Sequence, residues 1–235
     1  SASLTPERLA HGTTMGLSLR ISARQGRVPP AVRSIAIRYP GELGIALSGL
    51  GLETCTARPL EASGPGACPP DSLMGRGVAE AVVPFGPEMI HESASVTVVR
   101  AEDQDGYIAL LFDAQGISPV KANIVLSARL LPAHAPYGGL IEIAVPLIPS
   151  LPEAPPVSLL ALSATIGPQG LVYLRSEHGR QIPYAPKGIV LPERCPRRGF
   201  PFESTIAFQN GARAGARARV RCPGERRGRR GARSH

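Results

Sequence analysis

The chain is poor in aromatic residues and in lysine. Among its 235 residues there are five Phe, five Tyr and no Trp, and only Lys121 and Lys187 accompany 24 Arg. Sugar-binding surfaces commonly stack exposed Trp or Tyr against sugar rings, so this scarcity argues against such a surface. The preference for Arg over Lys is typical of a GC-rich genome, and therefore the arginines alone do not indicate a nucleic-acid partner.

Long apolar runs and long helices are also lacking. The longest apolar candidate is residues 157–166, far short of the roughly eighteen residues that a membrane-spanning helix needs. The 25 Pro and 26 Gly are spread along the chain without a period. Because these residues interrupt helices and favour turns, they indicate many short strands. The only helix that the sequence predicts covers residues 5–10, with Thr5 as its cap and Pro6 at its first position.

Motifs of catalysis and of cofactor binding are missing as well. There is no Gly-x-Ser-x-Gly elbow and no Walker phosphate loop, and His91-Glu92 lacks the second His of a zinc protease helix. Gly75-Arg-Gly77 matches only half of a dinucleotide loop and is interpreted as a turn that leads into a strand. The sequence thus predicts no catalytic residue, no cofactor and no metal, and a protein that is not an enzyme.

Two groups of acidic residues allow weaker alternatives. Residues 102–106 could offer carboxylates to calcium, but the loop lacks a later bidentate Glu, and Asp105-Gly106 is a common hairpin turn. Glu80, Glu92 and Glu142 lie on or beside expected strands, where a glycosidase would place a carboxylate pair. Solvent-facing strand positions are the ordinary interpretation of all three.

The cysteines indicate the cell compartment. Cys55, Cys68, Cys195 and Cys222 are separated by 13, 127 and 27 residues, and no Cys-x-x-Cys or His-x(3–5)-His accompanies them. The spacing favours two local disulfides, Cys55–Cys68 and Cys195–Cys222, over four buried thiols of a cytosolic protein. Such bonds persist in an oxidising compartment, so we expect a secreted or cell-surface protein. Since the chain opens without Met, we expect a mature form whose signal peptide has been removed.

Strict alternation of apolar and polar residues is the dominant pattern, and it is typical of strands with one buried face. It predicts about twelve short strands, which lie near residues 15–21, 32–38, 43–47, 77–83, 94–99, 107–112, 120–131, 140–145, 157–166, 171–174, 203–208 and 214–221. The predicted fold class is therefore all-β, an antiparallel two-layer sandwich or jelly roll. Residues 1–222 form this body, as one sandwich or as two that divide near residues 100–156.

The positive charge is confined to the C-terminal end. Residues 211–235 carry nine Arg and one acid, which accounts for the whole net charge of +8, while the rest of the chain is neutral. The last thirteen residues, 223–235, contain no large apolar side chain and are predicted to be disordered. This Arg-rich tail could contact an anionic cell-envelope polymer through charge alone; a codon-biased terminus without a partner is the simpler interpretation.

In the last expected strand, arginines alternate with small residues. Arg217, Arg219 and Arg221 are separated by Ala or Val, so they are expected to share one face. Charge along the outer face of an edge strand discourages pairing with another sheet. The pattern predicts an edge strand at this position.

Residues 64–79 contain the pattern Cys-Pro-x-x-Ser-x-x-Gly-x-Gly-x-Ala, which begins at Cys68. It is preceded by Gly49-Leu-Gly-Leu-Glu-Thr-Cys55, and Cys195 and Cys222 near the other end are each followed by Pro. Together these segments resemble a group of secreted proteins from high-GC bacteria. The resemblance implies an extracellular β fold in which Cys55 pairs with Cys68. It implies no activity and no catalytic residue.

These observations favour a non-enzymatic extracellular or cell-surface module with a structural or adhesion-type role. The alternative is a jelly roll that binds a small ligand or a polysaccharide, which requires a concave, partly apolar sheet face. A secreted hydrolase is favoured least, because it requires two or three titratable groups that converge in a cleft.

Overall fold

The computed structural model describes residues 1–23, 27–44, 49–85, 88–118, 122–147 and 156–222. The predicted all-β class is confirmed. The strands are β1 (Ala2–Thr5), β2 (Gly12–Arg20), β3 (Val32–Pro40), β4 (Leu73–Phe85), β5 (Glu88–Gln104), β6 (Tyr107–Ser118), β7 (Asn123–Pro132), β8 (Tyr137–Ala144), β9 (Ser158–Ile166), β10 (Tyr173–Glu177), β11 (Arg180–Tyr184), β12 (Ile189–Val190), β13 (Phe200–Phe208) and β14 (Arg213–Val220).

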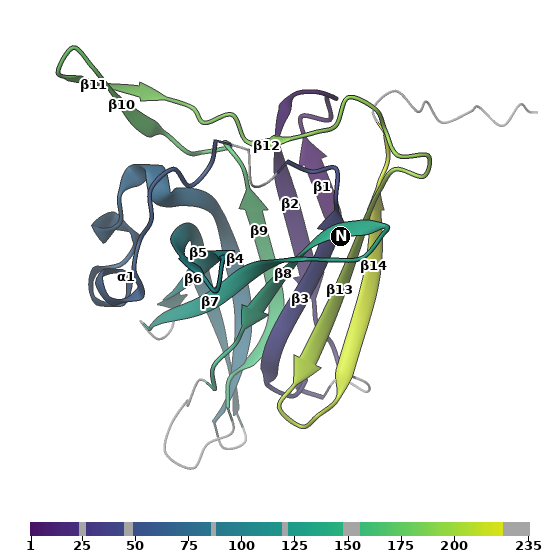
Figure 1. Ribbon diagram of the computed structural model, residues 1–235. Helices are drawn as coiled ribbons and strands as arrows, with labels where there is room; N and C mark the ends of the chain where they lie inside the picture. Colours follow the sequence, from purple (N-terminus) through teal and green to yellow (C-terminus); the bar gives the residue numbers. More distant parts are fainter. Residues whose placement is uncertain (24–26, 45–48, 86–87, 119–121, 148–155, 223–235) are drawn as a thin grey trace, which may run out of the picture.

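One strongly curved sheet contains nearly all of these strands. Its order is β1-β2-β9-β4-β5-β6-β7-β8-β3-β13-β14, with β12 paired to β2, and all pairs are antiparallel. The two end strands β1 and β14 approach each other without pairing, so the sheet is nearly closed (Figure 1). The two layers that the sequence predicts are thus the opposite walls of one curved sheet. A separate hairpin, β10–β11, projects from one end.

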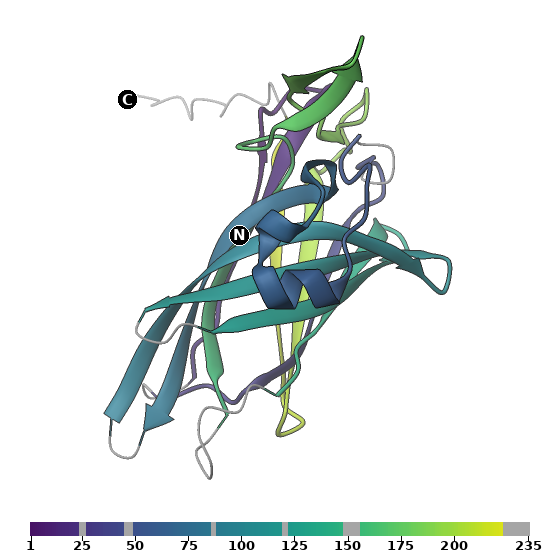
Figure 2. The same cartoon turned by 90° about the vertical axis from the view of Figure 1, so that its left-hand side faces the viewer.

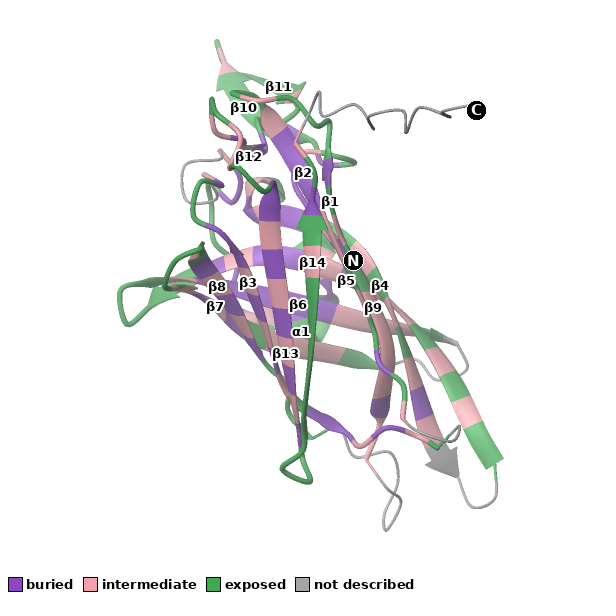
Figure 3. Ribbon diagram, turned by 90° about the vertical axis from the view of Figure 1, so that its right-hand side faces the viewer, coloured by how far each residue is buried: buried purple, intermediate pink, exposed green. Residues whose placement is uncertain are grey.

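Alternation of side chains explains how the sheet encloses a core. In β13 every second residue from Phe200 to Phe208 is buried, and the residues between them are partly exposed. The buried side chains point to the concave face, where they meet those of the opposite wall, among them Met15, Ile35 and Ile141. Figure 3 shows this pattern of buried and exposed positions along the strands. The core is therefore the interior of the curved sheet.

The predicted turn between β5 and β6 is confirmed. Asp105 and Gly106 have φ angles of 53° and 79°, and Gln104 pairs with Tyr107 across the turn. Two consecutive positive φ angles match the twist of antiparallel strands, and Gly and Asp tolerate them. Of the strand expected at residues 43–47, only Leu43 and Gly44 lie within the described residues, and Gly44 forms a single bridge with Val190.

The predicted helix at residues 5–10 is wrong. Thr5 ends β1 and pairs with Thr14, and the residues that follow form turns. The hydrogen bonds between β1 and β2 stabilise the extended conformation of Thr5 more than a capping residue can stabilise a helix of a single short turn. A short helix occurs instead as α1 (Ala57–Ser63), and two 3₁₀ turns, Pro65–Ala67 and Pro70–Ser72, follow it.

Both predicted disulfides are confirmed, with Cα–Cα distances of 5.3 Å for Cys55–Cys68 and 5.9 Å for Cys195–Cys222. The first closes the segment that contains α1. This segment lies over the outer face of β5, β6 and β7 (Figure 2) and buries Leu60 there against Val99 and other apolar residues of the sheet. We call residues 55–72 the cap. The cap thus buries part of the outer face of the sheet.

β14 ends the sheet, and most of it is exposed (Figure 3). Register places Arg217 opposite Glu203 of β13, and Glu203 opposite Arg38 of β3. The Glu203 carboxylate accepts hydrogen bonds from Arg217 Nε at 2.7 Å and from Arg38 at 3.0 Å on the outer face. Arg217 holds the pKa of Glu203 below its ordinary value. The arginines thus lie on the outer side of the strand that ends the sheet, as the sequence predicts. The predicted tail 223–235 lies outside the described residues.

Candidate functional site

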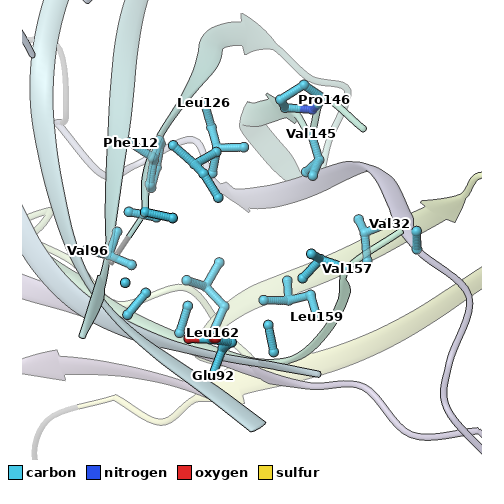
Figure 4. A pocket seen from close by; sticks show the side chains of 18 of the residues that line it. Val32, Glu92, Val96, Phe112, Leu126, Val145, Pro146, Val157, Leu159 and Leu162 are labelled. Carbon is cyan, nitrogen blue, oxygen red and sulfur yellow. The ribbon is translucent and has the colours of Figure 1, made fainter. Parts of the chain in front are cut away.

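The interior of the sheet contains a cavity of about 340 Å³ between its two walls. Residues of seven strands, β3 to β9, and of the segments beside them form its wall. Figure 4 shows how the side chains point into this space from all sides. Those labelled there are Val32, Glu92, Val96, Phe112, Leu126, Val145, Pro146, Val157, Leu159 and Leu162. We call it the main cavity.

Small residues at inward-facing positions create the main cavity. Ala79 and Ala81 on β4, Ala94 on β5, and Ala114 and Gly116 on β6 all line it. Register places these five residues side by side on three neighbouring strands. Larger side chains at these positions would fill the space, as Phe112 does two residues before Ala114 on β6. This patch is the sequence signal for the cavity, and it becomes visible only once the strand register is known.

The glycines of the Cys-Pro-x-x-Ser-x-x-Gly-x-Gly-x-Ala pattern have a structural role here. Gly75 and Gly77 lie within β4, so their interpretation as a turn is wrong. A Cβ atom at either position would overlap a backbone carbonyl oxygen of β9, that of Thr165 or that of Ser163. The glycines let β4 and β9 approach closely above the cavity. Ser72 of the same pattern is buried and donates a hydrogen bond to the Pro69 carbonyl oxygen at 2.6 Å.

The main cavity is almost entirely apolar. Of the described residues that line it, only Glu92 and Ser93 carry polar side chains. Glu80 lies next to them on β4 but points to the outer face, because it alternates with the inward-facing Ala79 and Ala81. The structure therefore does not join Glu80 and Glu92 into a carboxylate pair.

Glu142 is remote from both of these acids. It lies on β8, four strands away from β4, and accepts a hydrogen bond from Arg129 at 3.3 Å. Arg129 also pairs with Asp105 at 3.7 Å, and Arg100 pairs with Asp103 at 2.6 Å. Asp105 of the turn is thus paired with an arginine of β7, and Asp103 at the end of β5 is paired with an arginine of its own strand. Among the described residues, no three His, Cys, Asp or Glu side chains gather as metal ligands would.

A buried carboxylate lies outside the cavity, on the other side of the same strand. Asp113 of β6 is fully buried beneath the cap, and its two carboxylate oxygens have no hydrogen-bond partner among the described residues. Burial raises the pKa of Asp113 from its ordinary value of 3.8 to about 6, and the nearby amide of Asn123 lowers it only in part. That amide donates to the carbonyl oxygens of Leu60 and Glu61 at 3.1 and 3.0 Å. Sequence reasoning missed Asp113, because nothing in its neighbourhood along the chain indicates the cap.

Comparison with protein-family models, with curated proteins and with solved structures finds no match for this chain. Among the described residues, no helix has the length and apolar character that a membrane crossing requires. The site must therefore be interpreted from its own geometry. That geometry defines a partly open, apolar cavity with two polar side chains, within the curved sheet of a chain that has two disulfides.

Proposed function

We propose that the protein is an extracellular, non-enzymatic binding module that holds a hydrocarbon chain in the main cavity. The observation that carries this proposal is the cavity itself, about 340 Å³ with an almost entirely apolar wall. Natural ligand sites are apolar hollows of about this size or larger, with a few polar groups. The cavity thus meets the requirement of the small-ligand alternative, a concave apolar sheet face.

A purely structural or adhesive role leaves the cavity without an explanation. Protein interiors are close-packed, and voids in them lower stability because their lining lacks contacts. An apolar ligand would restore these contacts. A sugar fits the wall poorly, since it needs many hydrogen-bond partners and only Glu92 and Ser93 offer polar side chains.

The positions of the titratable groups support a binding function over catalysis. Among the described residues, the carboxylates with shifted pKa values are those of Asp113 and Glu203, and both lie on the outer face of the sheet. Inside the cavity, Glu92 has no second carboxylate or His within the described wall. A hydrolase needs several such groups around the reacting bond.

The binding proposal is tested by filling the cavity. In the main cavity, the Ala114→Phe variant should bind palmitate about a hundredfold more weakly, because its ring occupies the room of several methylene groups, each of which contributes about 0.8 kcal/mol. Displacement of a fluorescent fatty acid measures the affinity. Ala144→Phe is the matched control, since Ala144 is exposed at the end of β8 and should bind as the wild type does. Equal palmitate affinity of both variants, or no binding by the wild type, would contradict the proposal.

The extracellular location is a separate expectation that rests on the disulfides. Protein isolated from the medium or cell surface of its natural host should show no thiol that alkylates before reduction and four that alkylate after it. Peptide mapping by mass spectrometry should join Cys55 to Cys68 and Cys195 to Cys222. Free thiols in carefully handled native material would place the protein in a reducing compartment.

A further inference from the structure

A second compartment lies beside the main cavity, with an apolar wall toward the core and polar side chains, among them Arg20, Glu203 and Arg217, at its outer edge. It has a volume of about 400 Å³ and lies between β2 on one side and β13 and β14 on the other, where the sheet does not close. We call it the seam cavity. Leu17 and Leu19 of β2 form one wall, and Phe202, Ala214 and Ala216 form the other.

The open sheet explains why this compartment exists. β1 pairs with β2 as far as Leu17, and Ser1, the first residue of the chain, adds two hydrogen bonds with Ser18. The last two residues of β2 therefore have no described strand between them and β14. Ala214 and Ala216 share the inner face of the sheet with buried residues of β13, yet both are exposed. Their methyl groups are too small to reach β2. An inner-facing, apolar and exposed strand surface is a place where a ligand chain can bind.

The two compartments are separate spaces with a narrow link. A gap of about 20 Å³ lies between them. Phe112 and Leu162 belong both to this gap and to the main cavity, while Leu17 and Leu19 belong both to the gap and to the seam cavity. A gap of this volume has room for about one water molecule. A single hydrocarbon chain therefore cannot thread through it, and each compartment must be filled by a chain of its own.

A thin segment of chain divides the two compartments. Pro29 and Pro30 line the seam cavity, whereas the next residues, Ala31 and Val32, line the main cavity. The segment is fixed on both sides: Ser158 Oγ donates to the Pro29 carbonyl oxygen at 2.7 Å, and the Gln209 amide donates to the Ala31 carbonyl oxygen at 2.9 Å. Because Pro30 and Ala31 are consecutive residues, the two compartments are separated here by a single segment of chain.

We propose that the ligand is a lipid with two hydrocarbon chains, one in the main cavity and one in the seam cavity. This inference rests on the proposed binding function and extends it to a ligand class. Of the described residues that line the seam cavity, three are charged. Arg217 is paired with Glu203, whereas Arg20 has no ion pair within the described part of the chain and is the cation that an anionic headgroup can meet there. The residues that separate one-chain from two-chain ligands are those of the seam, above all Ala216.

Native mass spectrometry of the full chain tests the proposal by counting ligands. With palmitate as the probe, the wild type should bind two molecules, and Ala216→Phe and Ala114→Phe should each bind one. With dipalmitoylphosphatidylglycerol, the wild type should bind one molecule, and each variant should bind it about tenfold more weakly. Ala207→Phe is the matched control, because Ala207 faces outward on β13, and it should behave as the wild type. Ala214→Phe, at the neighbouring inner-facing position of β14, should have the same effect as Ala216→Phe.

The outcomes separate this inference from the binding proposal. If the wild type takes up one palmitate, Ala114→Phe removes it and both seam variants leave it unchanged, the main cavity is the ligand site and the two-chain inference is wrong. If Ala216→Phe and Ala214→Phe leave the affinity for the two-chain lipid unchanged, the inference is also wrong. Absence of any bound palmitate would overturn both proposals.

Discussion

Replacement of Asp113 with Asn is expected to raise the free energy of unfolding by about 2–3 kcal/mol at pH 7.5. The Asp113 carboxyl is buried under the cap without a hydrogen-bond partner among the described residues, and its pKa is raised to about 6. A shift of about two pKa units corresponds to about 3 kcal/mol of unfavourable interaction in the ionised form. Asn has nearly the same shape and carries no charge, so the variant avoids this penalty.

The pH dependence gives the same prediction a second test. Because the native pKa lies above the unfolded value, the native state binds more protons between about pH 4 and pH 6, and stability falls as pH rises through this window. Urea unfolding should show that the wild type loses stability from pH 4 to pH 7, whereas Asp113→Asn loses much less. Glu80→Gln, which alters an exposed carboxylate on the outer face of β4, is the control and should change stability by less than about 0.5 kcal/mol. A less stable Asp113→Asn variant would show that the ionised carboxylate is favourable in the folded protein.

The second large effect concerns the contact between β4 and β9. Gly75→Ala should destabilise the protein by about 3 kcal/mol or prevent folding, because the added Cβ overlaps the Thr165 carbonyl oxygen. Backbone atoms of a paired strand cannot move aside as a flexible side chain can. The measurement is the midpoint of urea unfolding, and circular dichroism verifies that the variant is folded.

Gly66 offers a matched control for this substitution. It lies in the 3₁₀ turn Pro65–Ala67, and a Cβ there would have nothing within 4 Å. Gly66→Ala should therefore leave stability almost unchanged. Similar stabilities for the two alanine variants would mean that β9 can shift away from β4, and that the glycines of the pattern have another role.

The sequence predicted the fold class and the disulfides because both depend on local signals. Alternating apolar residues and Asp105-Gly106 indicate strands and turns through interactions within a few residues. The cysteine spacing suggested the two local bridges for the same reason. The helix was misplaced, although Thr56 before α1 and Gly64 after it are ordinary helix boundary residues. Thr5 and Pro6 near the N-terminus form an equally good local signal for the start of a helix. The segment is extended instead because Thr5 pairs with β2.

The cavity and Asp113 could not be predicted, because both depend on contacts between distant segments. Ala79, Ala94 and Ala114 become neighbours only through the register of β4, β5 and β6. Asp113 occupies an ordinary alternating position, and only the cap, some fifty residues earlier in the chain, buries it. A polar residue on the outer face of a strand is normally solvated, so the sequence offered no reason to single it out.

The order of the strands has a consequence for the time at which the chain can fold. β2 pairs with β9, and β3 lies between β8 and β13, so the first two long strands await partners that are made more than a hundred residues later. Pairings of such long sequence separation close slowly. During synthesis, which proceeds from the N-terminus, β4 to β8 can pair in succession as hairpins, while β2 has only the short β1 as a partner and β3 has none until β8 is made. We expect these two strands to be the segments that a chaperone must shield, β2 until β9 emerges and β3 until β8 and β13 emerge.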